Sequence, residues 1–164
     1  MTIMDVAAKS DAELENIAAN HKRRRMPNAD LCMRARGELE RRHGHGLTFE
    51  KSFDLIMAVA REERCISYKN LADASGAMWS KVHYSIGNHL YRLVDYGRSL
   101  GWPMLSAIVV NAGRVEQGGM EPGALKGFIT LASELGLFKG GDEIALLKQQ
   151  QQAVFAYAKE KDQA

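Results

Sequence analysis

The chain has 164 residues, of which 46% are hydrophobic and 26% are charged, and its net charge is +2 at pH 7. These values are ordinary for one globular domain with a sizeable core and an appended element. The mild positive balance excludes a uniformly basic protein of the histone kind, so any nucleic-acid surface must be local.

Two cysteines, Cys32 and Cys65, lie in different predicted elements and form no CxxC pair. We expect both to be free thiols in a reducing compartment. Residues 1–5 lack the basic segment and apolar run of a secretory signal, and no run of about 18 apolar residues is present. The sequence therefore predicts a cytoplasmic protein without a membrane span.

The first predicted helix begins at Ser10 or Asp11, either of which can serve as the N-cap, and it ends before Pro27. Its end carries a cluster of cations that has two interpretations. Positive charges at a helix C-terminus are stabilised by the helix dipole, and the same charges also suit a phosphate-binding arm. The cluster consists of Arg23, Arg24 and Arg25.

A second helix is predicted over residues 29–42, with one apolar face and charged residues covering the rest. The apolar face comprises Leu31, Cys32, Ala35 and Leu39. The break after this helix, residues 43–46, holds His43 and His45 beside two glycines. Two such histidines can ligate a metal, but no neighbouring residue completes a site, so a loop is favoured and no metal or cofactor is predicted.

Capping residues define the next two predicted helices. Thr48 precedes a helix over residues 49–63 with an apolar stripe, and Ser67 precedes a helix over residues 68–74 that Gly76 ends. The apolar link between them is expected to be extended or a minor strand.

The predicted helix over residues 80–100 carries the most information about function. Its apolar positions are spaced by three and four residues, so one side is buried. On the other side lie Lys81, Tyr84, Ser85, Asn88 and Arg92. These side chains are able to bind phosphates, stack on bases or contact base edges, although a solvated polar face would look the same. Gly87 in mid-helix suggests a close contact with another backbone, either from a packed helix or from DNA.

The rest of the chain adds one strand and two helices. Residues 105–111 read as a buried strand because of their β-branched side chains. The glycine-rich residues 112–121 form a loop or hairpin, which is the candidate wing. Helices are predicted over residues 124–135 and, after an N-cap at Asp142, over residues 143–159.

Four motifs then stand in a particular order. Residues 67–72 read Ser-Tyr-Lys-Asn-Leu-Ala, and they are followed by residues 81–88, 104–111 and 123–126. This order resembles "SYxxLA", "KAARAVGG", "IPCHRVV" and "GGLxxK" in the C-terminal domain of the methylated-DNA alkyltransferases and alkyltransferase-like proteins. The resemblance covers residues 47–138, and it implies a winged-helix framework that approaches DNA.

Two departures from this family bear on the function. The position of its acceptor cysteine is near Ser106, and the histidine and arginine that follow are replaced by Ala107 and Ile108. Without a thiolate, alkyl transfer is not expected. The position of the family's intercalating arginine falls at Tyr84, which is able to wedge or stack between bases.

The predicted fold is α+β and mostly α, with a winged-helix-like core, a small sheet and additional N- and C-terminal helices. Its parts are a helical extension (1–46), the winged-helix-like domain (47–138) and a C-terminal amphipathic helix (139–164). Either end packs on the core or contacts a partner in a homodimer.

The predicted function is non-enzymatic binding of DNA, with duplex favoured. The reader is helix 80–98, and the predicted contacts are Lys81, Tyr84, Ser85, Asn88 and Arg92, supported by Lys69, Trp79 and Arg23, Arg24 and Arg25. One alternative is a protein-interaction module, such as an accessory or inhibitor protein of a phage, plasmid or defence system. Its anchors would be Trp79, Tyr84, Tyr91 and Trp102. A second alternative is a hydrolase acting on nucleic acid, although no catalytic motif stands in a suitable context.

Overall fold

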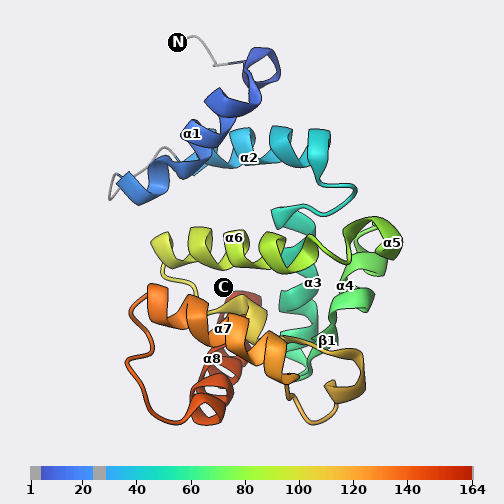
Figure 1. The fold of residues 1–164 in the computed structure, drawn as a ribbon, viewed down its shortest axis with the longest axis vertical. Helices are drawn as coiled ribbons and strands as arrows, with labels where there is room; N and C mark the ends of the chain where they lie inside the picture. The colour runs from blue at the N-terminus through green and yellow to red at the C-terminus, as the bar shows by residue number, and fades with distance from the viewer. Residues whose placement is uncertain (1–4, 24–28, 164) are drawn as a thin grey trace.

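The computed structural model describes residues 5–23 and 29–163, which form eight α-helices, three short 3-10 helices and one two-stranded sheet (Figure 1). The helices are α1 (Asp11–Arg23), α2 (Ala29–His43), α3 (Phe49–Arg61), α4 (Tyr68–Ala74), α5 (Trp79–Val82), α6 (Ile86–Ser99), α7 (Pro122–Glu134) and α8 (Glu143–Gln163). The 3-10 helices are η1 (Val6–Ala8), η2 (Leu105–Ile108) and η3 (Ala112–Arg114), and the strands are β1 (Ile66–Ser67) and β2 (Val109–Val110). The prediction of an α+β, mostly α protein is confirmed.

Helix starts follow the predicted capping residues. The side-chain oxygens of Ser10, Thr48, Ser67 and Asp142 each accept a hydrogen bond from the backbone N–H three residues later, at 3.0 to 3.2 Å. Each bond satisfies one of the N–H groups that a helix start leaves without an intrahelical acceptor. Local sequence therefore sets where these helices begin.

The sheet is smaller than predicted. Strands β1 and β2 pair in parallel, with Ile66 opposite Val109 and Ser67 opposite Val110. The prediction of a strand over residues 105–111 is wrong for its first half, which forms the 3-10 helix η2. Glutamines of α8 supply the hydrogen bonds that a strand ladder would otherwise provide there: Gln150 accepts from the Met104 N–H at 3.1 Å, and Gln151 donates to the Ala107 carbonyl at 3.0 Å.

The main core surrounds η2 and β2. Five of the six side chains in residues 105–110, all except Ser106, have no exposed surface. Helices α3, α6 and α8 contact this segment, and α7 packs on the same apolar cluster through Phe128, Ile129 and Leu131. The apolar stripes that the sequence predicts on these helices therefore meet around one central segment.

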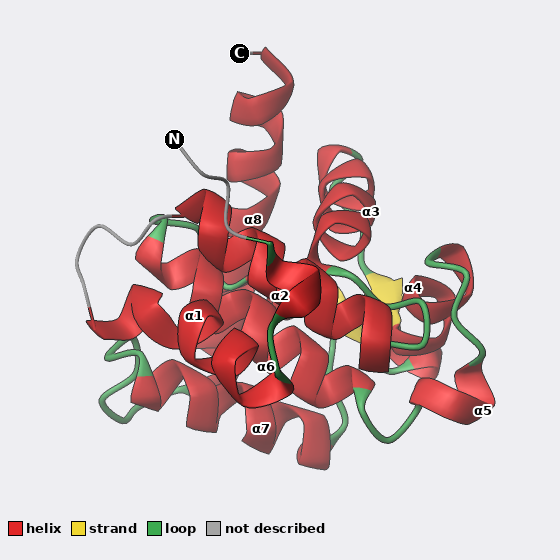
Figure 2. Ribbon diagram, turned by 90° about the horizontal axis from the view of Figure 1, so that it is seen from above, coloured by secondary structure: helices red, strands yellow, loops and turns green. Residues whose placement is uncertain are grey.

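Helices α1 and α2 form a hairpin with a small apolar cluster of its own. Leu14, Ala18, Ala35 and Leu39 are buried between the two helices. The hairpin lies over α6, whose opposite side faces α7 (Figures 1 and 2). The N-terminal extension thus packs on the centre of the molecule and forms one wall of a crevice described below.

Helix α8 also packs on the centre, against α3 and η2, and the end that carries the C-terminus extends past the other helices (Figure 2). Within the part of the chain that the structure describes, no helix has the length and apolar character needed to cross a membrane. Cys32 and Cys65 are both buried as thiols, and the Cys32 thiol donates a hydrogen bond to the Ile17 carbonyl at 3.2 Å.

The candidate wing, residues 112–121, is a loop. It contains the 3-10 helix η3 followed by turns, and the structure assigns none of these residues to a strand. Side chains of α8 hold it in place: Lys148 donates to the Gln117 carbonyl at 2.8 Å and Gln151 donates to the Gly118 carbonyl at 2.7 Å.

Candidate nucleic-acid interface

The predicted continuous helix over residues 80–100 is wrong, because it is split into α5 and α6 by a turn at residues 83–85. Side chains in the turn bond to the backbone of α5. The Nδ1 of His83 lies 3.0 Å from the Trp79 carbonyl oxygen, and the Ser85 hydroxyl donates to the Val82 carbonyl at 3.2 Å. Such local bonds compete with a continuing helix.

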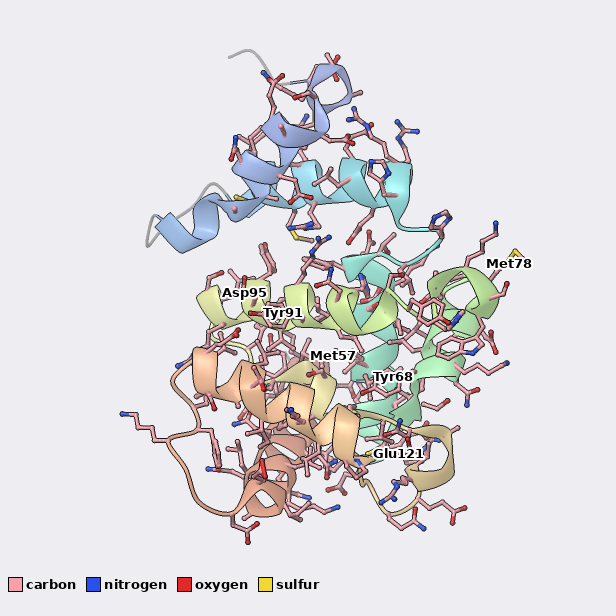
Figure 3. The ribbon with its side chains drawn as sticks, in the orientation of Figure 1. Met57, Tyr68, Met78, Tyr91, Asp95 and Glu121 are labelled. Carbon is pink, nitrogen blue, oxygen red and sulfur yellow. The ribbon has the colours of Figure 1, made fainter. Side chains whose placement is uncertain are left out.

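The split produces a projecting tip, which we call the aromatic tip and define as Met78, Trp79, Lys81, His83 and Tyr84. The side chain of Tyr84 is 93% exposed and that of Met78 is 64% exposed. Figure 3 shows Met78 pointing away from the body of the molecule. The ring of Tyr84 lies 3.9 Å from that of His83 between centroids, and the His83 ring lies 5.9 Å from Trp79. The exposed rings of His83 and Tyr84 therefore lie beside the partly buried ring of Trp79, which packs against the main core.

Two of the predicted cations lie in or near the aromatic tip. Lys69 forms an ion pair with Asp73, its neighbour one turn along α4, at 2.8 Å. Lys81 is exposed and has no ion pair with any residue that the structure describes. Lys81 is therefore the more available of the two cations for an outside anion.

The other predicted contacts on this segment lie elsewhere. Ser85, Asn88 and Arg92 are exposed, but they line a cavity of about 130 Å³ whose opposite wall is α2. We call this cavity the polar crevice. The structure thus divides the predicted reader face into two parts, the aromatic tip and the polar crevice.

Three residues that the sequence analysis left aside also line the polar crevice: Arg36, Glu40 and His89. The sequence places Arg36 and Glu40 four residues apart on the charged side of α2, which is expected to face solvent. In the structure both are only partly exposed. The four-residue spacing of Arg36 and Glu40 was the signal that the sequence offered for these two residues. It indicates a shared site only once the structure places α2 over α6.

Burial changes the protonation of two of these groups. Desolvation raises the pKa of Glu40 to about 7, against the opposing effects of a hydrogen bond from the Phe49 N–H at 2.9 Å and the charge of Arg36. Desolvation, with the charges of Arg36 and Arg92, lowers the pKa of His89 to about 4. The imidazole is therefore neutral at pH 7, and it is hydrogen-bonded to the Ser52 hydroxyl at 2.8 Å.

No protein-family model, curated protein or solved structure significantly similar to this chain was found. The resemblance to the alkyltransferase domain stays a prediction.

A second, largely apolar pocket of about 280 Å³ lies between α6 and α7. Gly87 lines it, and a Cβ atom at Gly87 would meet no atom within 4 Å. The expected close contact with a packed helix is therefore wrong, and the alternative of a contact with DNA stays a prediction. Tyr68 and Ser106 line the same pocket, and burial raises the pKa of the Tyr68 phenol.

His43 is the last residue of α2, and His45 lies in the turn that follows. His43 Nε2 lies 2.8 Å from a carboxylate oxygen of Asp11, which connects the end of α2 to the start of α1. Among the residues that the structure describes, no three His, Cys, Asp or Glu side chains gather as a metal site would require.

The remaining predicted contacts are dispersed. Arg24 and Arg25 lie outside the described residues, and α1 ends at Arg23. Of the anchors predicted for a protein partner, Tyr91 donates a hydrogen bond to Glu134 of α7. Trp102 packs inside the molecule against Phe53, with ring centroids 4.7 Å apart.

Proposed function

We propose that this chain binds duplex DNA through the aromatic tip, with Tyr84 stacking on bases or wedging between them and Lys81 contacting a phosphate. The observation that supports this most is the 93% exposure of the Tyr84 side chain beside two further rings. A large ring held out in water gains free energy when it stacks on a base, and every base offers a face for it. The motif order shared with the alkyltransferase domain also favours DNA.

The proposed contact differs from the one expected from the sequence. Helix α6 lies between α2 and α7, so α5 and the turn before α6 are the parts of this segment that project (Figure 1). Binding would therefore depend on the aromatic tip first, and on Asn88 and Arg92 only where DNA reaches the polar crevice. Ser106 has no thiol, so no alkyl transfer is proposed.

The test is a titration of fluorescent duplex DNA at low salt, followed by anisotropy. We expect Lys81→Glu to weaken binding about tenfold and to reduce the salt dependence, because a phosphate contact is lost. We expect Tyr84→Ala to weaken binding at least fivefold, since stacking contributes about 1–3 kcal/mol per base. Lys139→Glu is the matched control, because it makes the same charge change in the exposed segment between α7 and α8. Equal affinities for the wild type and both tip variants would contradict the proposal.

A second candidate is binding of a protein, either another protein or a second copy of the chain. The 64% exposed Met78 next to Tyr84 favours it, because methionine and tyrosine are enriched at protein interfaces. Light scattering tests the homodimer: a dimer that Met78→Lys dissociates, together with no DNA binding, would favour this candidate. We also propose a cytoplasmic location, which is supported by two cysteines that are present as thiols rather than as a disulfide.

A further inference from the structure

The polar crevice brings two arginines from different helices to one small cavity. Arg36 belongs to α2 and Arg92 to α6, and both line the cavity of about 130 Å³. Burial lowers the pKa of Arg36; the negative charge of Glu15 opposes this shift, and the positive charge of Arg92 adds to it. Neither guanidinium has an ion pair within 4 Å with any described residue. The two positive charges repel each other, and an anion bound between them would turn this repulsion into attraction.

The carboxyl groups around the cavity do not fill that role. Glu40 accepts a hydrogen bond from the Phe49 N–H at 2.9 Å, and its raised pKa of about 7 leaves it partly neutral at physiological pH. Glu15, which is exposed on α1, and Asp95 act on Arg36 only through charge, and the effect of Glu15 is larger than that of Arg92. Their attraction for Arg36 therefore exceeds the repulsion from Arg92, but it does not provide the guanidinium with a hydrogen-bonded anion.

The other lining groups favour an anion. His89 has a pKa of about 4 and so carries no competing charge at pH 7, while His43 is already paired with Asp11. Asn88 adds an amide donor in the first turn of α6. The N-cap Ser85 makes no side-chain capping bond, so the positive end of this 14-residue helix is left open at the cavity.

We propose that the polar crevice binds a phosphate group between the guanidinium groups of Arg36 and Arg92. Guanidinium is planar and offers two parallel N–H donors, which match the oxygens of a phosphate. The phosphate belongs either to a free small anion or, if the proposed function holds, to the DNA backbone. Only the second source depends on the proposed function.

The first experiment uses the full chain and inorganic phosphate. Side-chain Nε–H signals of arginine are followed by NMR at pH 7 during titration with phosphate, against sodium chloride of equal ionic strength. We expect saturable shifts of two signals, which Arg36→Gln and Arg92→Gln each remove, with phosphate affinity reduced about tenfold. Arg98→Gln is the control, because Arg98 is exposed on the same helix but does not line the crevice.

A second variant tests the role of the neighbouring carboxyl group. At pH 8, where Glu40 is charged, Glu40→Gln is expected to bind phosphate several-fold more tightly than the wild type. At pH 6, where the carboxyl group is mostly protonated, the two are expected to bind alike. No saturable phosphate shift, or shifts unchanged in both arginine variants, would overturn the proposal.

The DNA titration distinguishes the two sources. If the backbone supplies the phosphate, Arg92→Gln weakens DNA binding and inorganic phosphate competes with DNA more strongly than chloride does. If the ligand is a free anion, Arg92→Gln removes phosphate binding and leaves DNA affinity as it was. The Tyr84 and Lys81 variants test DNA binding in a separate titration. If they show that the protein does not bind DNA, the titration with inorganic phosphate still tests the phosphate site.

Discussion

Glu40 is a carboxyl group that folding transfers from water to a partly buried position. Its ordinary pKa of 4.5 rises to about 7, because desolvation outweighs the hydrogen bond from the Phe49 N–H. A raised carboxyl pKa means that the folded state binds the proton more tightly than the unfolded state. The stability that the neutral group contributes is therefore complete below pH 4.5 and is lost as the pH rises to about 7. His89, whose pKa falls to about 4, acts in the opposite direction and contributes stability above pH 6.5.

Glu40→Gln is expected to raise the free energy of unfolding at pH 8 by about 2 kcal/mol, because a neutral amide replaces a desolvated charge and still accepts the Phe49 N–H bond. At pH 4.5 the variant and the wild type are expected to be nearly equal. Urea unfolding at the two pH values measures the difference in the free energy of unfolding between the variant and the wild type. The contribution of His89 cancels in this difference because both proteins carry His89. A variant less stable than the wild type at pH 8 would show that the charged form is the stabilising one.

Among the elements, the C-terminal end of α6 packs closely against Trp102. A Cβ atom at Gly97 would lie 2.5 Å from Cε3 of Trp102, whose ring is also packed against Phe53. The same tryptophan donates its backbone N–H to the Gly97 carbonyl at 2.9 Å. Close approach of the ring to the helix therefore requires glycine at this position.

We expect Gly97→Ala to destabilise the protein by about 1–2 kcal/mol, because overpacking outweighs the gain in helix propensity. Gly127→Ala in α7 is the matched control, since its Cβ would meet no atom within 4 Å. That variant is expected to be as stable as the wild type or more stable by up to about 1 kcal/mol. Urea unfolding of both variants tests the pair, and equal effects would mean that Trp102 moves aside without cost.

At the scale of the whole molecule, the α1–α2 hairpin and the main core differ in how much apolar surface they bury. The hairpin's own cluster contains only Leu14, Ala18, Ala35 and Leu39. Its contact with the main core combines the apolar side chains of Cys32 and Met33 with the polar crevice. Regions with few buried apolar contacts open at lower free energy than the core.

Native-state hydrogen exchange is therefore expected to show α1 and α2 opening together before α3, α6 and α8. Leu39→Ala should lower protection in the hairpin by about 2 kcal/mol or more while the protection of the main core stays within error. Leu93→Ala, in the main core, is the control and should lower protection in both units. Equal protection of hairpin and core in the wild type would contradict a separately opening hairpin.

The candidate site could be predicted from the sequence only in part. The exposed polar residues of segment 79–92 were identifiable, because the apolar spacing of Val82, Ile86 and Leu90 marks the buried side. The division into an aromatic tip and a polar crevice was not, because it depends on a turn made by side-chain bonds of His83 and Ser85. Arg36 enters the site only through the position of α2.

The sequence by itself determined the helical elements other than the division between α5 and α6, since capping residues, apolar spacing and glycine stops act over a few neighbouring residues. Thr48, Ser67 and Asp142 begin their helices for that reason. Only the tertiary structure decided that residues 105–108 form a 3-10 helix, because the hydrogen-bond partners come from Gln150 and Gln151, more than 40 residues away. The same holds for Glu40 and His89, since desolvation is a property of the packed molecule and no short stretch of sequence encodes it.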